Sequence, residues 1–200
     1  MEKLPKINII YEDNHLLVVE KPVNIPVQED ISQDIDMITL LKKYRIKKEN
    51  KKGDAYIGLV HRLDRPVGGI MVFAKTSKAA SRLSEEIRNN TFHKTYLAVI
   101  QGTMPKEGKL EDYLIKDNNK NISYIATKDK GKYSALEYKI LNTKNNLSLV
   151  EINLITGRSH QIRLQFASRN HPLLGDSKYG NNPSTVSYTH LRAHETELHL

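Results

Sequence analysis

The chain has 200 residues, of which 38% are hydrophobic and 27% charged, a composition typical of a folded globular protein that excludes an intrinsically disordered one. Its 31 lysines and arginines against 23 acidic residues give a net charge of +8, which favours a polyanionic partner such as nucleic acid. The chain contains no cysteine, which excludes disulfides, thiolate catalysis and cysteine-ligated metal centres.

The first fifty residues are predicted to form a hairpin and then a helix. Residues 8–11 and 16–20 have strand composition, and the turn formers at 12–14 lie between them. Apolar residues at 37, 40, 41 and 44 recur at helical spacing, which predicts a helix. The lysine-rich residues 42–52 are either a solvated face or an edge that contacts phosphates, and the sequence leaves both interpretations open.

A polar turn between two apolar runs is the most informative part of the sequence. Residues 57–60 and 70–73 read as short buried strands. The turn between them holds His61, Arg62, Asp64 and Arg65, and it is closed by Pro66 and Gly68-Gly69. A rigid turn on a sheet is a common place for catalytic side chains. In the alternative interpretation, Asp64 only caps the turn and the arginines are solvated.

Beyond this turn, a helix and then a strand are predicted. Thr76 or Ser77 can cap a helix that ends near residues 89–90. Residues 94–101 alternate as an interior strand, with Tyr96, Ala98 and Ile100 on one face.

The remainder of the chain is predicted to be mostly strands. Residues 108–114 and 122–127 are weaker strand predictions, whereas residues 132–141 and 147–154 form a clear hairpin that turns at Asn145-Asn146. Several antiparallel hairpins with a few helices indicate the α+β class, with a mixed, mostly antiparallel sheet and flanking helices.

The segment that follows the second hairpin is predicted to enter a short helix. Gly157 is expected to permit a sharp exit from the strand, and Ser159 to cap a helix in which Ile162 and Phe166 share a face. A loop punctuated by proline and glycine follows from His171.

Four segments together resemble one enzyme family. They are KPVNIPVQ from Lys21, HRLDRPVGGIMVFAK from His61, KTYLAVIQG from Lys94, and TGRSHQIRLQFA from Thr156 with the later HPLLGDSKYG. In this order and at these spacings they resemble the RluA-type pseudouridine synthases, which isomerise uridine in ribosomal or transfer RNA. The resemblance runs from about residue 8 to residue 180.

The resemblance implies three catalytic residues. Asp64, in the HRLD motif, matches the carboxylate that acts at the glycosidic linkage of a flipped-out nucleotide. Arg163, in HQIR, matches the guanidinium that keeps this carboxylate ionised and oriented. Tyr96, in KTY, matches the active-site tyrosine, whose ring can stack on the extruded uracil. The residues alone favour an ordinary tyrosine of a sheet, and the family resemblance reverses that preference.

The resemblance also implies RNA contacts and no cofactor. Arg62 matches the position whose side chain fills the gap left by the extruded nucleotide. The predicted RNA-binding residues are Arg62, Arg65, Arg158, His160 and Gln161. We expect no metal, because His61, His160 and His171 show no zinc-type pairing, and we interpret them as structural or hydrogen-bonding residues.

The sequence departs from the family pattern in three places. Val67-Gly68-Gly69 stands where a small polar trio is usual, and Asn24 stands where a glycine is usual, although asparagine tolerates a left-handed backbone. Residues 186–200 resemble the translation of a sequencing adapter. We therefore expect a catalytic domain over residues 1–185 without its last strand, a non-native tail over 186–200, and a neighbouring strand left without its ladder partner.

The sequence thus predicts an isomerase that converts uridine to pseudouridine in structured RNA, with ribosomal RNA favoured over transfer RNA. No apolar run is long enough to span a bilayer, so a cytoplasmic monomer with no membrane partner is expected. Two alternatives stay open. One is a catalytically inactive RNA-binding or RNA-folding module of the same fold. The other is a carboxylate-dependent hydrolase of nucleosides or glycosides, for which Asp176 is a candidate second acid.

Overall fold

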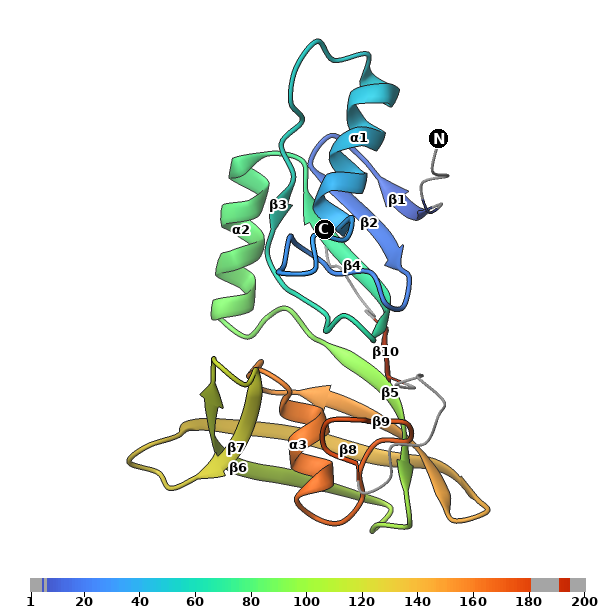
Figure 1. The fold of residues 1–200 in the computed structure, drawn as a ribbon, viewed down its shortest axis with the longest axis vertical. Helices are drawn as coiled ribbons and strands as arrows, with labels where there is room; N and C mark the ends of the chain where they lie inside the picture. Colours follow the sequence, from blue (N-terminus) through green and yellow to red (C-terminus); the bar gives the residue numbers. More distant parts are fainter. Residues whose placement is uncertain (1–4, 6, 181–190, 195–200) are drawn as a thin grey trace. The chain divides into compact units, whose positions relative to one another are not determined.

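A computed structural model describes residue 5, residues 7–180 and residues 191–194, and these divide into two compact units (Figure 1). The first unit ends at Phe92 and the second begins at His93. The predicted α+β class is confirmed in both units. In the part of the chain that is described, no helix is long and apolar enough to cross a membrane.

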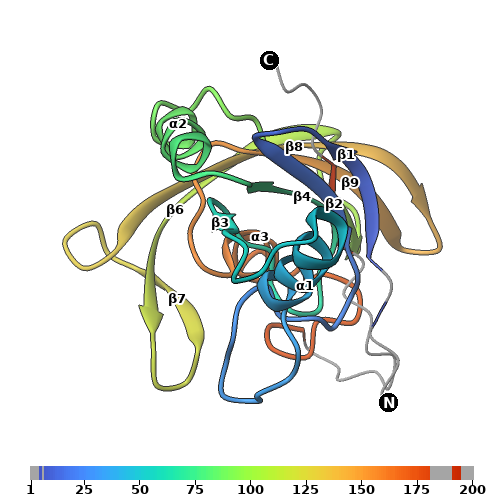
Figure 2. The ribbon, with the colours of Figure 1, turned by 90° about the horizontal axis from the view of Figure 1, so that it is seen from above.

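The first unit is a small antiparallel sheet between two helices. Its strands run in the order β1 (Asn8–Glu12), β2 (Leu16–Lys21), β4 (Gly68–Ala74) and β3 (Gly58–Leu59). The predicted hairpin at residues 8–20 is confirmed. Helices α1 (Met37–Glu49) and α2 (Ser77–Arg88) lie on opposite faces of this sheet (Figure 2).

Local sequence signals explain where both helices begin. Asp36 caps α1 by accepting a hydrogen bond from the Thr39 amide at 3.0 Å, and Thr76 caps α2 in the same way, as predicted. Alternate residues of β2 and β4 pack against α2. The hydrophobic core between the sheet and this helix includes Leu16, Val18, Val72, Ala79 and Leu83. This packing fixes the strand β4 that follows the polar turn.

A buried ion network ties β1, α1 and the end of β4 together. The Lys75 ammonium lies 2.7 Å from Glu12 and 3.4 Å from Glu49, and the Lys75 and Glu12 side chains are each 9% exposed. Burial by itself raises the pKa of Glu12, but hydrogen bonds from Lys48, Lys75 and Tyr44 lower that pKa to about 2. Lys75 therefore serves the fold of this unit.

This network predicts a loss of stability in acid. The ion pair with Arg45 lowers the pKa of Glu49 to about 2, the same value as the pKa of Glu12. A carboxylate with a depressed folded-state pKa stabilises the fold fully above its unfolded pKa near 4.5 and loses that contribution as pH falls toward 2. We expect Glu12→Gln to lower the free energy of unfolding by about 1–3 kcal/mol at pH 7, as measured with urea. At pH 2.5 the free energies of unfolding of the variant and the wild type should be closer to each other. Glu85→Gln, at an exposed position of α2, is the control and should unfold like wild type at both pH values.

The second unit is a six-stranded antiparallel sheet with one short helix. The strands run in the order β10 (Leu191–His194), β5 (Thr95–Gln101), β9 (Leu147–Leu154), β8 (Lys132–Lys144), β6 (Glu107–Asp117) and β7 (Ile122–Ala126). Asn145 and Asn146 both have positive φ, at 51° and 57°, as the predicted tight turn between β8 and β9 requires. Helix α3 (Gln161–Ala167) packs on one face through Phe166, whose ring lies 5.7 Å from that of Tyr138.

The tail contributes one strand to this sheet. Residues 191–194 form β10 and pair with β5, from Leu191 opposite Ala98 to His194 opposite Thr95. The prediction of an interior strand at β5 is therefore confirmed, and the expectation of a neighbouring strand without a partner is wrong for β5. The rest of the predicted non-native tail, residues 186–190 and 195–200, lies outside the described residues.

Candidate functional site

The turn that carries Asp64 connects β3 to β4 in the first unit. Asp64 is half-buried, and its carbonyl accepts a hydrogen bond from the Val67 amide at 2.9 Å. Gly69 has a φ of 138°, which a residue with a side chain rarely adopts, and a Cβ at Gly68 would lie 3.1 Å from Val23. Gly69 thus suits the backbone angle of the turn, and Gly68 suits the narrow space beside Val23.

The side chain of Lys21 anchors this turn from beneath. Lys21 ends β2 and is fully buried, and its ammonium donates to the carbonyls of Pro22 at 2.9 Å, Arg65 at 3.1 Å and Val67 at 2.7 Å. Three donors meet three carbonyls, so the ammonium fixes the backbone on the C-terminal side of Asp64. The sequence pattern does not predict this role for Lys21, although a lysine at the end of a buried apolar strand is an unusual feature.

Lys21 predicts an alkaline limb in the activity profile. Burial lowers the pKa of Lys21 to about 8, against the attraction of Asp64. Above that pH the neutral amine has two N–H donors, and its lone pair faces the third carbonyl. We expect kcat/KM to fall as pH rises through about 8, while urea unfolding stays cooperative at pH 9. A flat profile to pH 9.5 in rate assays would contradict this role.

Arg65 is held by the loop that precedes α1. Its guanidinium donates to the Ser32 hydroxyl at 2.9 Å and to the Asn24 carbonyl at 3.2 Å, and it forms an ion pair with Asp34. Asn24 has the predicted left-handed backbone, with φ of 64°. Arg65 therefore positions the turn, and contact with RNA through its side chain stays a prediction. Arg62, in contrast, is exposed and makes no hydrogen bond or ion pair with the described residues.

In the second unit, Arg163 is joined to a buried carboxylate. Its Nε and Nη2 donate to Asp176 at 2.7 and 2.6 Å, and the two residues are 5% and 1% exposed. Burial by itself raises the pKa of Asp176, but the hydrogen bonds and charge of Arg163 outweigh it and lower the pKa. The Arg163 guanidinium also lies 5.3 Å from the centre of the Tyr179 ring. Asp176 thus holds Arg163 in one orientation and is not an available second acid.

The residues around the start of α3 form an internal network. His160 is the N-cap of α3, with φ of 55° and no side-chain cap, so the prediction of Ser159 as the cap is wrong. Its Nδ1 lies 2.7 Å from the Tyr179 hydroxyl, which also accepts from the Ser123 amide at 2.8 Å. This geometry confirms the hydrogen-bonding interpretation of His160. His61 accepts from an amide of β4, and His171 contacts a carbonyl of β5.

Gln161 is equally internal. Its Oε1 accepts from Thr156 at 2.8 Å and from the Arg158 amide at 2.9 Å, and its Nε2 donates to the Ala135 carbonyl at 3.0 Å. Gln161 is 3% exposed and His160 is 9% exposed. Their hydrogen bonds fix the start of α3, and contact of either residue with RNA stays a prediction. Gly157 also differs from expectation, since it does not have positive φ and an added Cβ would meet only Lys94, at 3.7 Å.

Tyr96 lies on the same face of the second sheet as α3. Tyr96 is 7% exposed and stands opposite Ile152 of β9. Ile152 in turn stands opposite Tyr138 of β8, whose ring contacts Phe166 of α3. Directly opposite residues share a face, so Tyr96 and Arg163 belong to the same side of this unit. Arg158 is exposed on that unit, and its Nε donates to the Tyr133 carbonyl at 3.0 Å.

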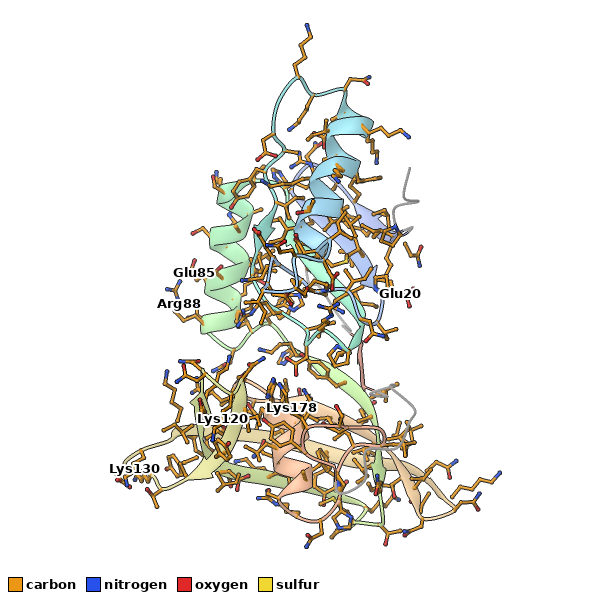
Figure 3. All side chains as sticks on the ribbon, viewed as in Figure 1. Glu20, Glu85, Arg88, Lys120, Lys130 and Lys178 are labelled. Atoms are coloured by element: carbon orange, nitrogen blue, oxygen red, sulfur yellow. The ribbon has the colours of Figure 1, made fainter. Side chains whose placement is uncertain are left out.

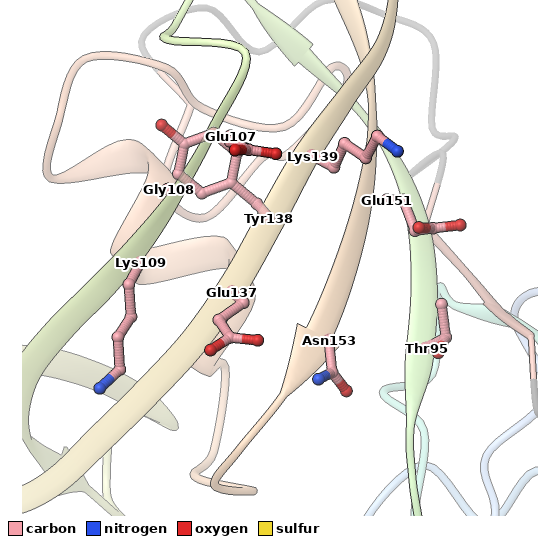
Figure 4. Close-up of a pocket in the computed structure, with 9 residues that line it drawn as sticks. All are labelled: Thr95, Glu107, Gly108, Lys109, Glu137, Tyr138, Lys139, Glu151 and Asn153. Carbon is pink, nitrogen blue, oxygen red and sulfur yellow. The ribbon is translucent and has the colours of Figure 1, made fainter.

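The other face of this sheet carries a shallow hollow of about 430 Å³ (Figure 4). The hollow is lined by alternating acidic, basic and polar residues: Thr95, Glu107, Gly108, Lys109, Glu137, Tyr138, Lys139, Glu151 and Asn153. Neither Tyr96 nor Arg163 lines it. The hollow is therefore separate from the predicted catalytic residues of the second unit.

The structure brings the predicted residues together in two groups. Arg62, Asp64 and Arg65 share one turn of the first unit, and Tyr96 and Arg163 share one face of the second. The predicted contact between Asp64 and Arg163 joins the two units and stays a prediction.

Comparison with known proteins identifies the family. The sequence pattern of a family described as RNA pseudouridylate synthase matches residues 15–168, which include both groups. The chain belongs to this family. A pseudouridine synthase fold is also found in the solved structures of human RNA Pseudouridylate Synthase Domain Containing 4 and Domain Containing 1, with TM-scores of 0.78 and 0.77. The sequence identities are 23% and 21%, and the matches cover 92% and 96% of this chain and 81% and 79% of those chains.

Several curated pseudouridine synthases are similar in sequence. Ribosomal large subunit pseudouridine synthase D of Borreliella burgdorferi is 30% identical over 97% of this chain and 61% of its own length. An uncharacterized RNA pseudouridine synthase of Bacillus subtilis, YhcT, is 32% identical over 96% of this chain and 64% of its own length. The chain thus spans less than two thirds of the length of these relatives.

Proposed function

We propose that this pseudouridine synthase homologue converts uridine to pseudouridine in structured RNA. The observation that carries the proposal is the Asp64 turn, in which the fully buried Lys21 fixes the backbone that follows an aspartate of the HRLD motif. Ribosomal RNA is the favoured substrate, because several similar proteins are named ribosomal large subunit pseudouridine synthase D. A cytoplasmic location and a monomeric state are part of the proposal.

In the proposed reaction, the bond between N1 of uracil and C1′ of ribose breaks while Asp64 acts at that linkage. The uracil turns, a bond forms between its C5 and C1′, the C5 proton is lost, and N1 takes up a proton. Arg163, held by its two hydrogen bonds to Asp176, orients the Asp64 carboxylate. Tyr96 stacks on the extruded uracil, and Arg62 fills the gap left in the RNA.

The test uses RNA that carries tritium at C5 of uridine. Because isomerisation breaks the C5–H bond, we expect the protein to release tritium into water without releasing free uracil. An inactive RNA-binding module binds the RNA and releases no tritium, and a hydrolase releases free uracil. Either result would overturn the proposal. Mapping of pseudouridine in host RNA with and without the intact gene then identifies the uridine.

A further inference from the structure

Five basic side chains gather at one edge of the second unit. We call them the basic rim: Lys116, Lys120, Lys132, Arg158 and Lys178. All five are exposed, and they come from β6, the β6–β7 turn, β8 and the two loops around α3. Asp117, next to Lys116 in sequence, accepts hydrogen bonds from the amides of Asn119 and Lys120, at 2.9 and 3.1 Å.

Strand register places two of these lysines on the face that carries α3. Lys132 stands opposite Leu114, and Lys116 stands opposite Ser123. Leu114 and Ser123 are buried, and the Ser123 hydroxyl donates to the Ser159 carbonyl at 2.8 Å, so this is the α3 side of the sheet. Because Lys116 is the diagonal neighbour of Lys132, their Cα atoms are about 7–8 Å apart.

The other members of the rim are anchored beside them. Lys178 donates to the Asn121 carbonyl at 2.8 Å, next to Lys120 in the β6–β7 turn, and Figure 3 shows Lys120 and Lys178 close together. Arg158 donates to the Tyr133 carbonyl, next to Lys132 at the start of β8. Lys116, Lys120 and Lys132 make no ion pair with the described residues. The basic rim therefore consists of two cations that are hydrogen-bonded to backbone carbonyls and three lysines that can bind an anion. It lies on the side of the unit that carries Tyr96 and Arg163.

We propose that the basic rim binds the phosphate backbone of the substrate RNA beside the target nucleotide. This inference rests on the proposed function for the identity of the polyanion. Lys116, Lys120 and Lys132 have no acidic partner among the described residues, and exposed cations on the face of the catalytic residues match the charge of a phosphate backbone. In contrast, the hollow on the opposite face is lined by three glutamates and two lysines and offers no such match.

The experiment compares two triple variants that remove the same charge. One is Lys116→Gln/Lys120→Gln/Lys132→Gln, and the matched control is Lys78→Gln/Arg82→Gln/Arg88→Gln on α2, where all three side chains are exposed and lack ion pairs with the described residues. Binding of a fluorescein-labelled RNA stem–loop with uridines in its loop is measured by anisotropy from low to moderate salt. We expect the rim variant to bind about tenfold or more weakly than the control, and its slope of log K against log salt to fall by about 2–3.

Tritium release separates this inference from the proposed function. With the rim variant we expect a higher KM and an unchanged kcat at saturating RNA. Equal RNA affinity and salt slope in the two triple variants would overturn the basic rim, even if the wild type releases tritium. If the wild type releases none while the two variants still differ in binding, the proposed function fails and the basic rim stands.

Discussion

Replacing Asp64 by asparagine is expected to lower the rate of tritium release by at least about 10²–10⁴-fold, the range lost when a positioned catalytic carboxyl is removed. Asparagine has the same shape but cannot act as a nucleophile or a base. Val67 donates to the carbonyl of residue 64, and Lys21 donates to the carbonyls of Arg65 and Val67, so these hydrogen bonds of the turn do not depend on the Asp64 carboxylate. The variant should therefore keep its fold and lose its chemistry.

Single-turnover assays with labelled RNA measure this loss, and thermal unfolding monitors the fold. Asp54→Asn is the matched control, because Asp54 is an exposed carboxylate of the same unit, paired with Lys42 at 2.6 Å. We expect the control to retain wild-type activity. An Asp64→Asn variant within about tenfold of wild type would show that the chemistry resides elsewhere.

Features encoded by neighbouring residues were predictable from the sequence. The Thr76 cap of α2, the β1–β2 hairpin and the turn at Asn145-Asn146 each depend on residues within a few positions of one another. The same holds for the location of the Asp64 turn between two strands. In these places local preference and tertiary structure agree.

Features that depend on distant parts of the chain were not predictable. The role of Lys21 requires carbonyls that lie 44 and 46 residues later, which no local pattern reveals. His160 is the N-cap of α3 in place of Ser159, and its ring contacts Tyr179, 19 residues away. Gln161 was predicted to contact RNA, and its amide is buried against the Ala135 carbonyl of β8. Such residues are recognised only when the fold supplies their partners.

The pairing of Arg163 was predicted only in part. The sequence predicts Asp64 as its partner, whereas the second unit by itself supplies Asp176, which lies 13 residues away and binds both Nε and Nη2. The amides of Lys178 and Tyr179 also donate to Asp176, at 2.9 and 3.1 Å. Contacts within the second unit thus orient Arg163. A catalytic group needs this kind of support from its neighbours to stay in position.

Replacing Asp176 by asparagine is expected to destabilise the second unit by about 3–5 kcal/mol, because it removes the carboxylate that this unit places against the buried Arg163 guanidinium. For a chain of this size the melting temperature should fall by about 6–20 °C. Calorimetry or circular dichroism measures the change. Since a depressed carboxyl pKa stabilises the fold above its unfolded value, the deficit should be present at pH 7 and shrink as the wild type is acidified.

A double variant separates stability from activity at this pair. Arg163→Met/Asp176→Leu removes both charges and fills the site with apolar side chains, so we expect it to be more stable than Asp176→Asn alone. It should nevertheless release no tritium, because no guanidinium remains to orient Asp64. If the double variant is stable and active, Arg163 serves only the fold. If the double variant is stable and inactive, the ion pair with Asp176 serves to orient the Arg163 guanidinium for catalysis. The loss of activity in Asp176→Asn then reflects lost orientation of Arg163 as well as lost stability.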